Sequence, residues 1–310
     1  MFWVKLHKCK SSAVLLALAA SGISVFAAAG KDEGGPEVSA IIEKSVAANT
    51  ADWKLQPLYA RQEHDIKTKV DSGGKGIGQQ SKTYDVTMLE GSPYYRLTAL
   101  NNEPLPPEQA QQEHDKFARE VQKRKTETSD QRKARLAKYQ NERAEEHLLM
   151  QQMVDAFIFK LRGEERVSGI DCYLFDASPN PDYNPPVEKA RVLLGMRGHL
   201  WVDKAGYHWV KVEAEVTKPV QFGYFIAQVK PGTRFQLEQA PVDGVWLPKH
   251  FTESVNASVF GIYNMRSRQE EIYSNYEPLS ARHAEGSLTH AVSTAEAALS
   301  GSRPGGSGER

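Results

Sequence analysis

Two histidines and two tryptophans lie close together in one short stretch, "GHLWVDKAGYHWVKVEAEVTKP" at residues 198–219. Histidine transfers protons and binds metals near neutral pH, so this stretch is the first candidate for chemistry. The segment Asp203-Lys204-Ala205-Gly206 predicts a three-residue hairpin loop, closed by Gly206 in the left-handed conformation. In that register His199 and His208 lie on opposite faces of the hairpin. They are therefore not expected to bind one metal ion together.

The same register separates apolar from polar side chains. It pairs Trp201 with Trp209 across the strands on the polar face, where we expect an aromatic pair. The opposite face is predicted to point inward, and it carries Leu200, Val202, His208, Val210, Val212, Ala214 and Val216. The stretch therefore predicts one hairpin of a sheet that covers something apolar, and it argues against the wall of an active site.

Linear catalytic motifs are missing elsewhere in the chain. The sequence contains no H-E-x-x-H, no G-x-S-x-G and no cysteine pair suited to metal binding. The glycine-rich residues 72–78 lack the P-loop spacing and read as a hairpin loop, and Cys172 reads as a small buried residue. We therefore expect a non-enzymatic protein with no cofactor and no metal site; a hydrolase without a linear motif stays open as an alternative.

The N-terminus has the three parts of a secretory signal peptide. Lys5, Lys8 and Lys10 precede an apolar stretch from Ala13 to Phe26, which ends in three alanines with a cleavage site near Ala29. An uncleaved anchor helix is the alternative, although the apolar run is short for a membrane span. Loss of residues 1–29 leaves a slightly acidic chain without a transmembrane span, which argues against nucleic-acid binding. We expect a periplasmic or secreted protein.

The rest of the chain predicts a large antiparallel sheet interrupted by helices. Residues 38–46 have the apolar spacing of a short helix, and residues 58–70 alternate as a half-buried strand with Arg61 and Glu63 on its polar side. Residues 107–156 predict a long helical insertion with a break near 126–130, where Ser129 or Asp130 is the expected cap. Strands with tight turns follow, which indicates an antiparallel meander. We expect one domain over residues 30–280 and a disordered tail over 281–310.

The helical insertion is locally basic. Residues 116–138 contain nine basic and three acidic side chains. Such a charge favours attraction to anionic headgroups or to an acidic partner protein, and a solvated helix face with mixed charges is the alternative.

Four stretches resemble the LolA/LolB-like family, the outer-membrane lipoprotein-sorting proteins, and in particular secreted bacterial proteins of that type. They are "LNNEPL", "AFIFKLRGEERVSGIDCYLFDASPNPDYNPP", "RGHLWVDKAGYHWVKVEAEVTKPVQFGYFIAQVKPGTRFQLEQAPVDGVWLP" and "EEIYSNY". The likeness extends over roughly residues 38–278. It implies an α+β fold, in which an incomplete antiparallel β-barrel, that is a curved sheet, has helices covering its concave side. It also implies a cavity that shields acyl chains.

From these observations we expect an exported binding protein that holds a lipid, a lipoprotein acyl chain or another hydrophobic ligand in a concave apolar cavity. The candidate wall residues, taken from strand alternation, are Val210, Val212, Phe222, Phe235, Leu237 and Phe251. A filled core at the same positions is the alternative. A different class of function also stays open: a protein-interaction or envelope-stress sensor module that docks an envelope protein partner through the charged helices.

Overall fold

The computed structural model describes residues 35–71, 73–223 and 226–280. The predicted signal peptide and the predicted tail lie outside these residues, as do the first five residues of the predicted domain. Among the described residues, no helix is both long and apolar enough to cross a bilayer.

The centre of the molecule is a single antiparallel sheet. Its order is β4-β3-β2-β1-β13-β12-β11-β8-β7-β6-β5, with β9 and β10 paired beside β12. The strands are β1 (Tyr59–Val70), β2 (Gly76–Leu89), β3 (Ser92–Leu100), β4 (Glu103–Pro104), β5 (Phe157–Val167), β6 (Ile170–Pro179), β7 (Met196–Asp203), β8 (Trp209–Val216), β9 (Val220–Phe222), β10 (Ala227–Val229), β11 (Arg234–Val242), β12 (Val245–Val259) and β13 (Tyr263–Pro278). One edge of the sheet is formed by β4 and β3 and the other by β5. The two edges do not pair with each other, so the sheet stays open.

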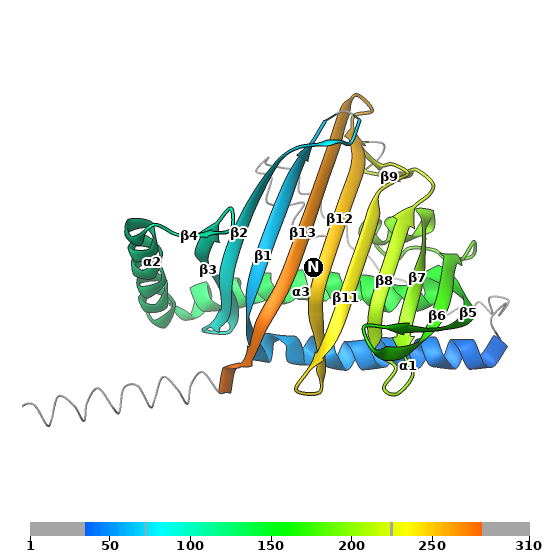
Figure 1. Ribbon diagram of the computed structural model, residues 1–310, viewed down its shortest axis with the longest axis horizontal. Helices are drawn as coiled ribbons and strands as arrows, with labels where there is room; N and C mark the ends of the chain where they lie inside the picture. The colour runs from blue at the N-terminus through cyan, green and yellow to red at the C-terminus, as the bar shows by residue number, and fades with distance from the viewer. Residues whose placement is uncertain (1–34, 72, 224–225, 281–310) are drawn as a thin grey trace, which may run out of the picture.

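Helices cover one face of this sheet. The elements are α1 (Gly35–Leu55), the 3₁₀ turn η2 (Gln56–Leu58), α2 (Pro107–Lys125), α3 (Ser129–Ala156) and the 3₁₀ segment η3 (Glu188–Gly195). Figure 1 shows α1 and α3 running across the strands on the same side, while α2 stands beside the edge formed by β3. We call the side on which α1 and α3 lie the covered face. The architecture is the expected α+β fold, an incomplete barrel with helices over its inner side.

The main core fills the space between the covered face and the helices. The stripe predicted for α1 points into it, since Val38, Ile41 and Ile42 are all buried. Phe175 of β6 and Leu200 of β7 meet this stripe from the sheet and are almost fully buried. Burial of the α1 stripe positions this helix over the strands, at roughly 1.5–3 kcal/mol for each large apolar side chain.

The hairpin between β7 and β8 differs from its predicted register. The nitrogen of Asp203 donates to the oxygen of His208 over 2.8 Å, so the loop is one residue longer than expected. Tyr207, with φ of 63°, takes the left-handed conformation that was predicted for Gly206. Gly206 is required for another reason: a Cβ atom at this position would lie 2.6 Å from Cδ2 of His208. The turn type was therefore predicted wrongly.

A bulge in β8 separates the two tryptophans. Trp201 pairs with Lys211, but its neighbour Val202 pairs with Trp209, which leaves Val210 as an extra residue in β8. Trp209 therefore faces the helices, where its Nε1 donates to Oγ of Ser45 in α1 over 3.0 Å. Trp201 lies on the opposite face with the Lys211 ammonium 4.8 Å from its ring. The predicted tryptophan pair was wrong, because a bulge reverses the alternation of side chains beyond it.

The charged side of β1 is also placed differently from its prediction. Glu63 is fully buried on the covered face, opposite Tyr273 of β13. Arg61 lies with it, and its guanidinium is 5.6 Å from the Tyr273 ring. Alternation alone suggested that these charges face solvent. They are buried instead because they form an ion pair with each other beneath the helices.

The helical insertion has its break close to the predicted position. α2 ends at Lys125 and α3 begins at Ser129. The cap is Thr128, however, rather than Ser129 or Asp130. Its hydroxyl accepts from the nitrogen of Gln131, while the Gln131 side chain accepts from the nitrogen of Thr128, which completes a capping box.

Candidate functional site

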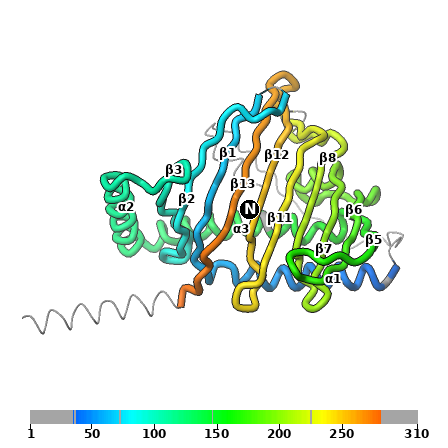
Figure 2. The backbone as a smooth tube through the Cα atoms, in the orientation of Figure 1, coloured from blue at the N-terminus to red at the C-terminus, as the bar shows by residue number. Residues whose placement is uncertain are grey.

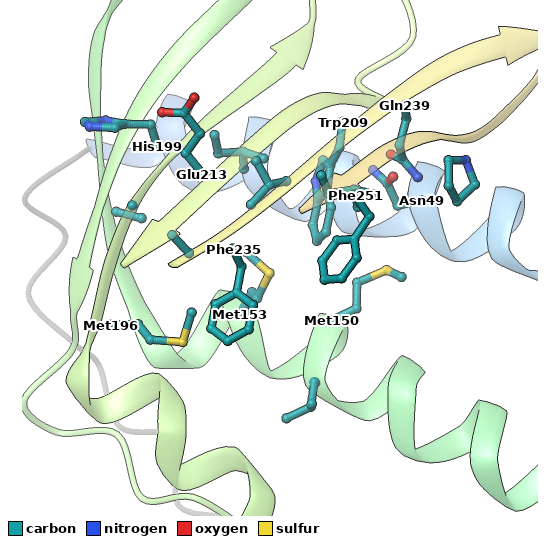
Figure 3. A pocket seen from close by; sticks show the side chains of 18 of the residues that line it. Asn49, Met150, Met153, Met196, His199, Trp209, Glu213, Phe235, Gln239 and Phe251 are labelled. Carbon is teal, nitrogen blue, oxygen red and sulfur yellow. The ribbon is translucent and has the colours of Figure 1, made fainter. Parts of the chain in front are cut away.

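A cavity of about 220 Å³ lies between the covered face and the two long helices. The sheet contributes side chains from β8, β11 and β12, and α3 contributes three apolar side chains from its last two turns. Its apolar lining includes Val212, Phe235, Leu237, Phe251, Met150 and Met153. Figure 3 shows Met150 and Met153 of α3 directed toward Phe235 and Phe251 of the sheet.

Four of the six predicted wall residues lie around this cavity. Val212, Phe235, Leu237 and Phe251 line it together. They are brought together because β11 pairs with both β8 and β12: Leu237 lies opposite Val212 on one side and Phe251 on the other. Three adjacent strands therefore place apolar side chains at one level of the covered face.

The other two predicted wall residues lie elsewhere. Phe222 of β9 is partly buried against the main core, outside the lining of the cavity. Val210 was placed on the wrong face. It packs on the far side of the sheet with Cys172, Trp201 and Trp246, because the bulge at this residue turns its side chain outward.

α3 supplies a part of the cavity wall that was not predicted from the sequence. Spacing marks one narrow line along this helix, through Ala144, Leu148 and Gln151, but Ala144 and Gln151 are exposed. The residues that face the cavity are Leu149, Met150 and Met153. Their spacing of one and then three residues was the available signal. Two methionines in the wall have a physical consequence, since unbranched thioether chains adapt to the shape of an occupant at little cost.

One end of the cavity is polar. Asn49 of α1 donates from Nδ2 to the oxygen of Ser45 over 2.8 Å, which directs its Oδ1 away from that contact. This Oδ1 and Oε1 of Gln239 are both buried, and neither has a hydrogen-bond partner among the described residues. Figure 3 shows the two amides near each other at the end of the cavity, close to Phe251. Two acceptors at the end of an apolar channel are suited to an amphiphilic ligand whose polar group donates hydrogen bonds.

The same end of the cavity is held together by Asp52 of α1. Its Oδ2 lies 2.6 Å from Nδ1 of His208, and its Oδ1 accepts from the nitrogen of Trp246 over 3.2 Å. The His208 ring also stacks on Trp246, with ring centroids 5.2 Å apart. His208 is thus a packed histidine with one carboxylate partner, and it joins the β7–β8 hairpin to α1.

His199 has a separate environment. Its Nδ1 lies 2.8 Å from Oδ1 of Asp176, and its ring meets the ring of Trp201 edge to face on the uncovered side of the sheet. The two histidines of the opening stretch therefore contact different carboxylates and do not form one site.

A buried group of charges borders the cavity at Tyr273. Carboxylate oxygens of Glu63, Asp65 and Glu271 lie within 4.8 Å of one another. Arg61 donates from Nη2 to Glu63 over 2.8 Å, and the Tyr273 hydroxyl donates to Glu271. Sequence alternation missed this group because it put these charges in solvent.

The electrostatics of this group follow from burial and charge. Burial disfavours the charged guanidinium and is the largest single effect, but the Glu63 carboxylate and the hydroxyls of Tyr95, Tyr276 and Tyr273 together outweigh it and raise the pKa of Arg61. Burial, assisted by Glu271 and Glu63, raises the pKa of Tyr273 well above its ordinary value. The tyrosine therefore stays protonated and donates a hydrogen bond, and the group acts as a structural network that joins β1 to β13.

Comparisons with known proteins give similarities of structure only. No protein-family model matches the sequence. No curated protein matches it either. Several solved structures match the chain, among them a DUF1329 family protein from Desulfovibrio piger, with 14% identity, a TM-score of 0.29 and coverage of 78% of this chain and 92% of that one.

Two further matches carry names of the kind that the sequence resemblance implied. One is a putative outer membrane lipoprotein-sorting protein domain from Vibrio parahaemolyticus, with 11% identity and a TM-score of 0.29 over 76% of this chain and 92% of that one. The other is a LolA superfamily protein from Nitrosomonas europaea, with 11% identity and a TM-score of 0.27 over 77% and 91%. At these values the likeness identifies no ligand.

Proposed function

We propose that this chain is an exported binding protein that holds a single acyl chain, or a similarly thin hydrophobic ligand, in the cavity beneath α1 and α3. The observation that supports it is the apolar wall of Val212, Phe235, Leu237 and Phe251 facing the methionines of α3. A volume of about 220 Å³ is below the roughly 300–1,000 Å³ of pockets for drug-sized molecules. It favours one narrow chain.

Binding in such a cavity needs no covalent chemistry. Each methylene that leaves water contributes about 0.8 kcal/mol, so a chain of several methylenes gains appreciable affinity from burial alone. The acceptors Asn49 and Gln239 then orient the ligand, because a donor on its polar group pairs with them at the end of the cavity. The lipid or lipoprotein acyl chain expected from the sequence has this combination of an apolar tail and a polar head.

A matched pair of variants on β11 tests the proposal. Leu237→Trp places a large side chain in the cavity, whereas Gln236→Trp makes the same substitution one residue earlier, on the other face of the sheet. We expect the wild type and Gln236→Trp to take up a fluorescent monoacylglycerol, whose hydroxyls can donate hydrogen bonds, and Leu237→Trp to bind it at least about tenfold more weakly. Equal binding by all three proteins, or no binding by the wild type, would contradict the proposal.

Native mass spectrometry gives an independent test of ligand binding in the cavity. The purified protein is expected to retain lipid, and Val212→Asp, which puts a carboxylate into the apolar wall, is expected to lose it. Circular dichroism on the variant checks that it is folded, since Val212 is only partly buried.

A second candidate function uses the helical insertion. Many basic side chains of α2 and the first half of α3 are exposed, including Lys123, Lys125, Arg132, Lys133 and Lys138. These favour docking of an acidic envelope protein. Lys125→Gln/Lys133→Gln/Lys138→Gln is expected to weaken capture of such a partner; capture that is unchanged would dismiss this candidate.

A further inference from the structure

The hairpin between β12 and β13 ends in a group of exposed apolar side chains. Phe260, Ile262 and Tyr263 are 65%, 72% and 66% exposed, and Met265 follows them on β13 at 47%. The turn is tight: Phe260 has φ of 52°, which is unusual for a bulky residue, and Gly261 has φ of 70°. Folding thus presents these side chains to solvent at the end of a long hairpin.

Two neighbouring turns add to this group. The nitrogen of Phe260 donates to the oxygen of Ile226 over 2.7 Å, which holds Ile226 against the hairpin, and the Ile226 side chain is 50% exposed. The β1–β2 hairpin carries Ile77, which is 65% exposed. Its Gly74 lies beside Arg266, since a Cβ atom there would be 3.7 Å from Nη1 of that arginine. Figure 2 shows the β1–β2 and β12–β13 turns together at the top of the molecule.

We call this surface the apolar tip and define it by Ile77, Ile226, Phe260, Ile262, Tyr263 and Met265. Most of the strongly exposed large apolar side chains among the described residues belong to it. It is the convex end of a protruding hairpin rather than a groove, a shape that suits insertion into a soft surface better than capture of a peptide.

Basic side chains surround the apolar tip. The segments 66–80, 226–232 and 254–268 that form this end of the sheet contain six basic residues and one acidic residue. Five of the basic side chains are exposed, namely Lys67, Lys69, Lys75, Arg266 and Arg268. The single acid, Asp71, accepts hydrogen bonds from the nitrogens of Gly73 and Lys75 within its own turn. The tip therefore has a strong positive charge, although the whole chain has balanced charges.

We propose that the apolar tip docks on the surface of a bilayer that contains anionic phospholipids. Phenylalanine and isoleucine enter the boundary between headgroups and acyl chains, and tyrosine is favoured at that level because its ring is apolar and its hydroxyl is polar. Lysine and arginine behind them bind the phosphates, each strengthening the association about fivefold. The basic side chains around the apolar tip therefore favour an anionic membrane surface as its binding partner.

Docking is independent of ligand binding in the cavity. Phe251 lies in β12 and Phe260 directly follows it, and the nine residue steps between them span about 30 Å of extended chain. A lipid surface at the tip therefore does not touch the cavity wall, and the cavity proposal can fail while this one holds.

Sedimentation with lipid vesicles tests the docking. The wild type is expected to bind vesicles that contain phosphatidylglycerol, and to bind phosphatidylcholine vesicles much more weakly. Phe260→Ser/Ile262→Ser should lower binding by at least about tenfold, because it removes two apolar groups from the interface. The matched control is Leu58→Ser/Leu161→Ser, which changes two exposed leucines elsewhere and should bind like the wild type.

The charge requirement has its own pair of variants. Lys69→Gln/Lys75→Gln/Arg268→Gln is expected to weaken binding on the order of a hundredfold. Lys160→Gln/Arg162→Gln/Arg166→Gln removes the same charge from β5, at the far end of the sheet, and should have little effect. Failure of the wild type to bind, equal binding to neutral and anionic vesicles, or equal losses in tip and control variants would overturn the proposal. The tip would then be a protein contact.

Discussion

Among the residues that the structure describes, Arg61 and Glu63 form the most buried ion pair. Their side chains are 10% and 1% exposed, and the guanidinium also lies over the Tyr273 ring. Charges in such a place are tolerated only when they are paired, because an isolated buried charge is strongly disfavoured. The pair therefore fixes the side of β1 that faces the helices.

Replacement of Arg61 is expected to be severe. Arg61→Ala leaves Glu63 buried without its cation, and we expect a loss of about 3–5 kcal/mol in the free energy of unfolding. Chemical denaturation measures it. Arg96→Ala is the control, since Arg96 pairs with Asp85 but is 41% exposed, and its loss should be under about 1 kcal/mol. Equal losses in the two variants would contradict the expectation that the buried Arg61–Glu63 pair contributes more to stability than an exposed ion pair.

Cys172 introduces a pH dependence above neutrality. Burial, with help from Asp203 and Asp171, raises the pKa of its thiol from 9.0 to about 11. The folded state thus favours the neutral thiol. This preference for the neutral thiol contributes about 2–3 kcal/mol to the free energy of unfolding. The contribution is fully present below pH 9 and is lost as the pH rises through 11.

Urea unfolding across this pH range measures the effect. The wild type is expected to lose stability more steeply than Cys172→Ala, which has no thiol to ionise. Parallel pH profiles for the two proteins would contradict this assignment. Below pH 9 the native thiol should also resist thiol reagents, because the thiolate is the reactive form.

At the scale of elements, α2 is held at the sheet edge by one arginine. Nη1 of Arg124 donates to the backbone oxygens of Leu89 and Ser92 over 2.8 and 3.0 Å, and its side chain is 8% exposed. Phe117 packs beside it on Tyr94, with ring centroids 5.2 Å apart. The basic run of this helix is therefore partly structural, and α2 covers the edge strand β3.

Loss of Arg124 should release the helix. Arg124→Ala is expected to cost about 1.5–3 kcal/mol, since it leaves the oxygens of the β2–β3 turn without a charged donor. Amide hydrogen exchange in α2 and β3 should accelerate, while that of β11 and β12 should not. Lys123→Ala, at an adjacent exposed position, is the control and should leave both unchanged. Uniform acceleration across the sheet would indicate global destabilisation instead.

The elements also show what the sequence could and could not predict. The start of β5 at Phe157 was predicted, because the helical insertion was expected to end at residue 156. The register of β7 and β8 was not, since no residue type marks the bulge at Val210. Alternation found Val212, Phe235, Leu237 and Phe251, which follow regular pairing. It missed Met150, Met153 and the buried Arg61 pair, because their placement depends on helices that pack from distant parts of the chain.

For the whole molecule, three features lie at separate places on one open sheet. The cavity lies between the covered face and the helices α1 and α3. Figure 1 shows α2 beside the edge at β3 and the β12–β13 hairpin, which carries the apolar tip, at another end of the sheet. This separation lets ligand binding and surface docking be tested by different substitutions. Flexible methionines on one wall and a rigid sheet on the other allow the cavity to adapt without rearrangement of the fold.

The central claim is that an acyl chain occupies the cavity between β11 and α3. A crystal structure with a monoacylglycerol whose acyl chain carries bromine at its methyl end tests it most directly, because the bromine gives an anomalous signal at one position and the glycerol hydroxyls can donate to the two acceptors. We expect this signal between Phe235, Phe251 and Met153, with the head of the ligand directed toward Asn49 and Gln239. A signal elsewhere on the protein, or a cavity closed by its own side chains in the presence of saturating ligand, would contradict the account.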